Sequence, residues 1–224
     1  MNFKMSNKNA YLIEILGIIL HIIFISIGML TYAGGTQDNP SLSGYTFWFN
    51  TFSDLGRVTA HNGKPNLTSM ILFSIAYCTI AATMVPFYLV FPRLFNDTTI
   101  EKKLTKIGGT LGIISSIAFF LVVAAPADIL YTPHMIFAIS AYIAILFMSI
   151  LYTIALFLNK RFPRVYTYVF IIFSVVFFAF LMMALIALIF GIRSLLTIGQ
   201  KIGTTALLIC FPILTYGAWK LEKE

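Results

Sequence analysis

The sequence predicts an all-α, polytopic membrane protein that folds as a bundle of six transmembrane helices. Of its 224 residues, 59% are hydrophobic and only 10% are charged, and the mean hydropathy is +0.92. Because a soluble domain carries about 25% charged residues, this chain has too few charges to coat a globular surface. Six separate stretches are also long and apolar enough to cross a bilayer, which takes roughly 20 mostly apolar residues. A soluble enzyme and a disulfide-stapled secreted module are therefore excluded.

The predicted spans follow one another along a single transmembrane domain that covers residues 1–224. Their apolar runs are continuous and do not alternate with polar residues, which excludes transmembrane strands. The first run exceeds the roughly 7–15 residues of a signal-peptide core, so we expect it to remain as a span. The six predicted spans are 11–32, 68–91, 107–126, 134–158, 165–190 and 201–221.

The distribution of basic residues predicts how the spans are oriented. Eleven of the 15 Lys and Arg residues fall in the N-terminal segment, the second and fourth connections and the C-terminal segment. Connections rich in Lys and Arg stay in the cytoplasm. We therefore expect a protein integral to the plasma membrane with both termini in the cytoplasm. The net charge of +7 then reflects orientation, and no nucleic-acid partner is expected.

The connection between the first two spans carries the first group of polar residues. Within residues 45–61, Asn50, Asp54, Arg57 and His61 recur at steps of 4, 3 and 4, and aromatic residues occupy another face. This spacing predicts an amphipathic helix over 45–61 at the extracytoplasmic mouth of the bundle. Asp54 and Arg57 are expected to form a salt bridge. Either that bridge only stabilises the loop helix, or the helix covers a pocket and directs Asp54 into it.

Two further groups of polar residues lie at the same predicted end of the bundle. Asp128 precedes the fourth span and His134 opens it, so they either cap and anchor that helix or face inward beside Asp54. Arg193 lies with Gln200 and Lys201 near the start of the last span. These three residues either extend to the membrane surface, or one of them reaches the same pocket and binds an anion.

Two ionisable residues lie inside the first predicted span, and their role is open. Glu14 and His21 are seven residues apart and share nearly one helix face. Ionisable residues within a membrane are costly and are candidates for function. The alternative for His21 is a neutral imidazole bonded to a neighbouring hydroxyl group. A haem site is not expected, because no second histidine lies at the middle of a span.

Four short motifs occur in order along the chain: Phe49-Asn-Thr-Phe-Ser-Asp-Leu-Gly-Arg57, Asn66 at the second span, Ala125-Pro-Ala-Asp128, and His134-Met-Ile-Phe-Ala138. Together they resemble a prokaryotic family of six-span membrane proteins, the domain of unknown function 998. The pattern is more distantly similar to the DRAM-like six-span family, which includes a factor in GPI-anchor lipid remodelling. The resemblance extends over almost the whole chain. It implies the following candidate pocket residues: Asn50, Ser53, Asp54, Gly56, Asn66, Asp128 and His134.

The predicted function is the binding of a lipid or another amphiphile in an extracytoplasmic polar pocket. Asp54, Asp128 and His134 are of the types that act in acid–base catalysis or bind a metal. A metal-assisted hydrolase or transferase that modifies lipids, with a divalent ion such as zinc, is one form of this prediction. The remaining candidate ligand-binding residues are Asn50, Ser53, Arg57, His61, Asn66 and Arg193.

Two other functions stay open at this point. One is transport of a small solute or proton, with Glu14 and His21 as relay groups. The other is a structural or regulatory subunit whose aromatic loop binds a partner protein. The sequence has no established hydrolase signature, so it does not decide whether the protein is an enzyme. The expected partners are the bilayer, a lipid-like small molecule and a second copy in a homodimer.

Overall fold

The computed structural model describes residues 6–222. Six of its helices are long and apolar enough to cross a membrane, which confirms the predicted all-α, six-span fold. These helices are α1 (Asn7–Thr31), α3 (Leu67–Val90), α4 (Thr99–Ala124), α5 (Tyr131–Leu158), α6 (Arg164–Phe190) and α7 (Arg193–Leu221). Two short helices accompany them: α2 (Phe52–Leu55) and the 3₁₀ turn η1 (Phe91–Leu94).

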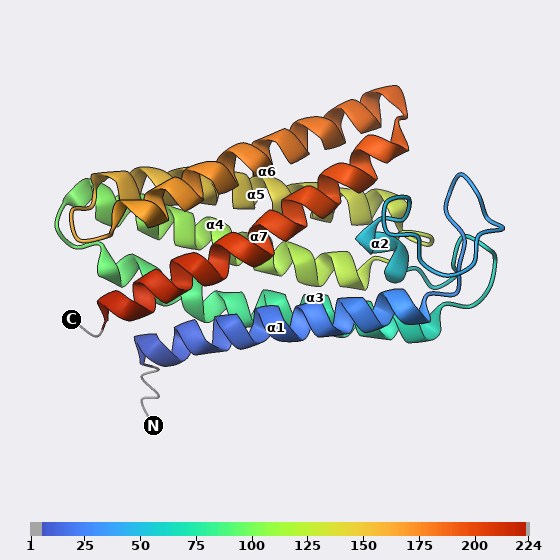
Figure 1. Ribbon diagram of the computed structural model, residues 1–224, viewed down its shortest axis with the longest axis horizontal. Helices are drawn as coiled ribbons and strands as arrows, with labels where there is room; N and C mark the ends of the chain where they lie inside the picture. Colours follow the sequence, from blue (N-terminus) through green and yellow to red (C-terminus); the bar gives the residue numbers. More distant parts are fainter. Residues whose placement is uncertain (1–5, 223–224) are drawn as a thin grey trace.

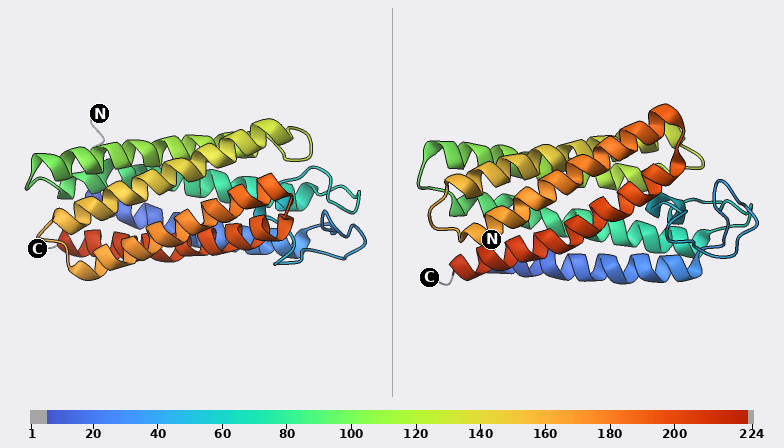
Figure 2. Two further views of the ribbon diagram at one scale, coloured as in Figure 1. Left: turned by 90° about the horizontal axis from the view of Figure 1, so that it is seen from above. Right: turned by 45° about the horizontal axis from the view of Figure 1, so that its top comes forward.

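The six long helices form a closed ring in chain order. Each packs against the next long helix along the chain, and α7 returns to pack against α1. The helices run along the long axis of the molecule, and α7 passes obliquely from the end of α6 toward α1 (Figure 1, Figure 2). The start of α1 and the end of α7 lie at one end, which we call the termini end. The segment 32–66 lies at the opposite end, which we call the loop end.

Two of the long helices begin well before their predicted spans. α4 starts at Thr99 and α7 at Arg193, each eight residues ahead of the apolar run that predicted it. The prediction followed the apolar residues, whereas the backbone stays helical through the polar turns that precede them. For α4 the start is fixed by Thr98, whose side chain accepts a hydrogen bond from the backbone N–H of Glu101 at 3.2 Å.

Small residues on α4 let bulky tyrosines of neighbouring helices pack closely, as small residues do in membrane proteins. A Cβ atom at Gly108 would lie 2.6 Å from the ring of Tyr152 on α5. A Cβ atom at Gly112 would lie 2.5 Å from the ring of Tyr88 on α3. These glycines of α4 therefore form a packing surface between three helices.

The predicted amphipathic helix over 45–61 is wrong. Only Phe52–Leu55 is helical, and turns precede and follow it. This short helix is capped by Thr51, which forms a capping box with Asp54: each side chain accepts a hydrogen bond from the other's backbone N–H. The chain then turns at Gly56, where a Cβ atom would lie 2.5 Å from the ring of Phe73 on α3. The segment thus packs on the bundle as a folded loop and does not form an independent helix.

Candidate functional site

A cavity of about 510 Å³ opens at the loop end, between the 32–66 segment and helices α5, α6 and α7. This volume is within the range of small-molecule sites, roughly 300–1,000 Å³. One wall of this loop-end cavity carries polar and charged side chains: Gln37, Thr51, Ser53, Asp54, Arg57, His61, Asp128, His134, Arg193 and Gln200. The rest of the lining, which we call the apolar wall, comes from α5, α6 and the start of α7: Met135, Ala138, Ile139, Phe180, Leu181, Ala184, Leu188 and Leu196.

Asp54 is the centre of the polar wall, and only 3% of its surface is exposed. Its Oδ1 atom lies 3.0 Å from Nε2 of His61. The Arg193 guanidinium donates to both carboxylate oxygens at 3.1 Å. Asp54 was expected to pair with Arg57, and that expectation is wrong: the Nε atom of Arg57 donates instead to a backbone carbonyl of its own loop. The charge partner of Asp54 thus comes from α7.

The Asp54 carboxyl stays ionised near neutral pH. Burial raises its pKa, but the His61 hydrogen bond and the Arg193 charge outweigh burial and lower the pKa to about 2. A carboxylate in this state neither donates nor accepts a proton readily at neutral pH, so an acid–base role does not fit it. Its chemical role in the cavity is to hold Arg193 and His61 in place.

Asp128 also lines the loop-end cavity, but its carboxylate is occupied by backbone groups. It accepts hydrogen bonds from the N–H of Val58 at 3.1 Å and from that of Thr59 at 2.8 Å. These bonds tie the first loop to the short connection before α5. Asp54 and Asp128 therefore line one cavity, as expected, while each binds partners of its own.

His134 stands on the first turn of α5 and is 3% exposed. Its Nδ1 atom lies 2.8 Å from the backbone carbonyl oxygen of Ala125, and its Nε2 atom lies 3.0 Å from Oγ of Ser53. A carbonyl oxygen only accepts hydrogen bonds, so Nδ1 carries the ring proton and donates it to Ala125. Nε2 is then left to accept the proton of the Ser53 hydroxyl.

Asn50 and Asn66, both predicted to bind a ligand, lie behind the cavity wall. The Asn50 amide donates to the Gly35 carbonyl at 2.9 Å and to Asp54 at 3.2 Å. The Asn66 amide donates to the carbonyl oxygens of Leu55 and Arg57, each at 3.0 Å. Both side chains are buried and shape the loop that carries the lining residues.

Lys201 was considered as an anion-binding residue, but its surroundings do not fit that role. It is 1% exposed, and its ammonium group lies 3.6 Å from the centre of the Phe52 ring. It also approaches the rings of Tyr45 and Phe47 and donates to the Tyr45 hydroxyl. Cation–π contacts of this kind stabilise a desolvated ammonium group. Lys201 thus fastens the first loop to α7, while its neighbour Gln200 accepts from the backbone N–H of Phe52 at 2.8 Å.

No ligand set for a metal is present in the described part of the chain. Among residues 6–222, no group of three or more His, Cys, Asp and Glu side chains is placed to hold an ion. The zinc site expected from Asp54, Asp128 and His134 fails for a visible reason. The Asp54 carboxylate is bound by Arg193 and His61. The Asp128 carboxylate accepts from backbone N–H groups. The two ring nitrogens of His134 contact Ala125 and Ser53.

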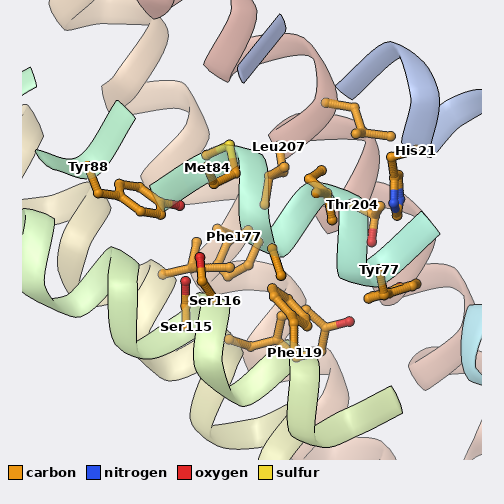
Figure 3. A pocket seen from close by; sticks show the side chains of 15 residues that line it. His21, Tyr77, Met84, Tyr88, Ser115, Ser116, Phe119, Phe177, Thr204 and Leu207 are labelled. Carbon is orange, nitrogen blue, oxygen red and sulfur yellow. The ribbon is translucent and has the colours of Figure 1, made fainter. Parts of the chain in front are cut away.

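A second cavity, of about 40 Å³, lies in the middle of the bundle. His21, Tyr77 and Thr204 lie toward one end of it, and Tyr88 and Ser115 lie at the other end (Figure 3). One water molecule takes roughly 10–15 Å³ of cavity volume on this measure, so the cavity has room for about three water molecules. The Nδ1 atom of His21 lies 3.1 Å from the carbonyl oxygen of Ala76, so its partner is backbone and not the expected hydroxyl.

Glu14 is fully buried, and both of its carboxyl oxygens lack a hydrogen-bond partner within residues 6–222. The Thr215 hydroxyl of α7 lies near this carboxyl without reaching hydrogen-bond geometry. A buried polar group without a partner is unfavourable and calls for a reason. Because of this buried carboxyl, proton-coupled transport stays an alternative function.

Besides the apolar lining residues, four polar ones were not predicted from the sequence: Gln37, Thr51, Tyr131 and Tyr142. The two tyrosines were detectable in principle. Tyr131, His134, Ala138 and Tyr142 follow one another on α5 at steps of 3, 4 and 4, which places them on one helix face. Once His134 is assigned to a pocket, the same face therefore includes both tyrosines. Gln37 lies in an irregular loop and gives no such periodic signal.

Comparison with known proteins adds no match to this geometry. No family model matches the chain, and searches of curated proteins and of solved structures found no match either. The resemblance to the six-span families therefore stays a prediction. The loop-end cavity is the evidence on which a function rests.

Proposed function

We propose that the protein binds a lipid or another amphiphile in the loop-end cavity. The observation that carries this proposal is the division of the cavity lining into polar and charged residues, most of them on the first loop, and apolar residues, most of them on α5 and α6. An amphiphile has the same division, with a polar head and an apolar tail. Sites for such ligands combine hydrophobic lining with a few polar groups that fix the orientation.

The charges of the polar wall favour a polar or anionic head group. Arg193 is neutralised by Asp54, and Asp128 accepts two backbone hydrogen bonds. Arg57 also lines the cavity and forms no ion pair within residues 6–222. Its guanidinium is therefore the group left to bind a phosphate or carboxylate.

The apolar wall favours entry from the membrane. It is formed largely by α5 and α6, and two of its residues, Ile139 and Leu188, are 38% and 42% exposed on the bundle. Exposed apolar side chains on a membrane helix face lipid. A ligand tail would therefore pass between the bilayer and the cavity without crossing a polar surface.

The orientation of the bundle is part of the proposal. Basic residues are concentrated in the connections at the termini end, which favours a cytoplasmic location for that end. The loop-end cavity would then open at the extracytoplasmic leaflet of the plasma membrane. A homodimer is compatible with this arrangement.

The test is to identify the molecules that remain bound after gentle detergent purification, using mass spectrometry. We expect an amphiphile at near-equimolar amount in the wild type. Ala184→Trp places a large ring in the apolar wall and should reduce the bound amphiphile at least tenfold. Ile172→Trp, on a 61% exposed position of the same helix outside the cavity, should leave it unchanged. Equal retention by the two variants would overturn the proposal.

A further inference from the structure

The contact between Ser53 and His134 has the geometry of a nucleophile and its general base. Ser53 Oγ lies 3.0 Å from His134 Nε2, although 81 residues separate them in the chain. On the other side of the ring, Nδ1 donates to Ala125 at 2.8 Å. A hydroxyl within hydrogen-bond reach of an imidazole, with a third group that orients the ring, is the arrangement that activates serine nucleophiles.

The pair also lies where a substrate would be accessible. Ser53 and His134 both line the loop-end cavity. Ser53 is partly exposed to that cavity, whereas His134 is buried behind it. The nucleophile therefore faces the ligand space, and its base is shielded from bulk water. The apolar wall next to them suits an acyl chain.

We propose that Ser53 and His134 form a catalytic pair that hydrolyses the ester bond of an amphiphile bound in the loop-end cavity. This inference rests on the function proposed above and adds a reaction and a substrate class to it. It requires no metal, because the histidine itself takes the proton of the nucleophile. Two of the three residues expected to bind zinc, Asp54 and Asp128, have no part in the reaction.

The reaction proceeds in two balanced steps. In the first, Ser53 Oγ attacks the ester carbonyl carbon, and its proton passes to His134 Nε2. The C–O bond to the alcohol then breaks, the alcohol leaves with that proton, and an acyl-serine remains. In the second step, water from the loop end attacks the acyl carbon and gives a proton to Nε2. The carboxylic acid leaves as Ser53 regains its proton.

Two other groups have assigned positions in this scheme. The Ala125 carbonyl holds the His134 ring in one tautomer, the role that a carboxylate has in a three-residue triad. Arg57, a cation of the same cavity without an ion-pair partner in residues 6–222, keeps the role proposed above and binds the head group of the substrate. Asp54 holds Arg193 and is not a member of the catalytic pair.

The experiment uses the full chain in detergent micelles and a fluorescent fluorophosphonate, which reacts covalently with activated serines. We expect the probe to label the wild type at Ser53, as located by peptide mass spectrometry. Ser53→Ala should abolish labelling and the hydrolysis of a medium-chain p-nitrophenyl ester. Because a general base contributes roughly 10²–10⁴-fold, His134→Gln should slow both reactions by about 100-fold or more.

Ser41→Ala is the matched control, because Ser41 is an exposed serine of the same loop, bonded only to Asn39. It should label and hydrolyse like the wild type. Labelling that is absent from Ser53, or unchanged in His134→Gln, would overturn the inference. If His134→Gln does not fold, Ser53→Cys replaces it: the new thiol should react with iodoacetamide at least tenfold faster than a thiol at position 41 in Ser41→Cys. Equal rates would contradict activation by His134.

The failure of this inference and the failure of the proposed function are distinguishable. Ser53→Ala should still retain the bound amphiphile, whereas Ala184→Trp should lose the amphiphile and the ester hydrolysis together. An amphiphile retained by a protein that the probe does not label would leave the binding function intact and remove the catalytic pair.

Discussion

At the scale of single residues, the charge state of Asp54 depends on side chains that lie far from it in the sequence. Arg193 and His61 lower the pKa of the carboxyl to about 2 against the effect of burial. Arg193 forms no ion pair with another carboxylate in residues 6–222. This buried contact therefore joins the first loop to the start of α7, and it holds one corner of the loop-end cavity.

The variant Asp54→Asn should destabilise the protein. The amide is nearly the same shape, but it removes the charge and leaves the Arg193 guanidinium partly buried without a counter-ion. Breaking a buried ion pair from one side costs on the order of 3 kcal/mol. We expect a clearly lower melting temperature in detergent, measured by intrinsic fluorescence. Asp38→Asn, at an exposed position of the same loop, should melt like the wild type.

The same ion pair gives a pH dependence whose sign follows from the pKa. Because the folded-state value is about 2 and the ordinary value is 3.8, Asp54 contributes its full stability above about pH 4. That contribution is lost as the pH falls toward 2. The melting temperatures of the wild type and Asp54→Asn should therefore converge over this window. A difference that stays constant down to pH 2 would contradict the assignment.

The sequence identified the Asp, His and Arg residues that line the loop-end cavity but not their partners. Asp54, His134 and Arg193 stood out because ionisable side chains are rare in this chain. Spacing within the loop favoured Arg57 as the partner of Asp54, since the two are three residues apart. The observed partner Arg193 is 139 residues away, and only the packing of α7 against the loop brings it near. The Ser53–His134 contact was hidden for the same reason.

At the scale of helices, apolar length was a reliable signal and amphipathic spacing was not. Each predicted span became a helix, because a chain inside a bilayer must satisfy its backbone hydrogen bonds internally. Residues 45–61 have no such constraint, so their helix-like spacing did not determine their structure. The capping box of Thr51 and Asp54 ends the preceding turn and starts the short helix α2. Tertiary contacts with α3 and α7 fix the conformation of the remaining residues of the loop.

Close packing of α1 on α3 can be tested at two glycines of α1. A Cβ atom at Gly17 would lie 1.8 Å from Oγ1 of Thr83, so Gly17→Ala forces the helices apart. Overpacking of this kind costs roughly 1–3 kcal/mol, and the melting temperature should fall accordingly. At Gly28 the nearest atoms are 3.8 Å away, so Gly28→Ala should melt at or above the wild-type temperature. Equal effects at the two sites would contradict the observed register of α1 against α3.

At the scale of the whole molecule, the closed ring explains why the loop-end cavity lies outside the centre of the bundle. Helices packed in chain order fill the centre of the bundle with aromatic side chains and leave about 40 Å³ there. At the loop end, α6 diverges from α5 (Figure 1, Figure 2), and the loop-end cavity is lined there by α5, α6, α7 and the first loop. The polar residues of the loop thus meet the apolar residues of α5 and α6 at the membrane boundary. This arrangement supports the proposed amphiphile site.

The proposed orientation can be tested in intact cells with single cysteines and a membrane-impermeant maleimide. Asp38→Cys places a thiol on the loop end, and Lys103→Cys places one on the first turns of α4 at the termini end; both positions are exposed. Because basic connections are retained in the cytoplasm, we expect Asp38→Cys to be labelled from outside and Lys103→Cys only after permeabilisation. The wild type, whose Cys78 and Cys210 lie inside α3 and α7, measures the background. The opposite labelling pattern would place the loop-end cavity on the cytoplasmic leaflet, and the substrate would then be an amphiphile of that leaflet.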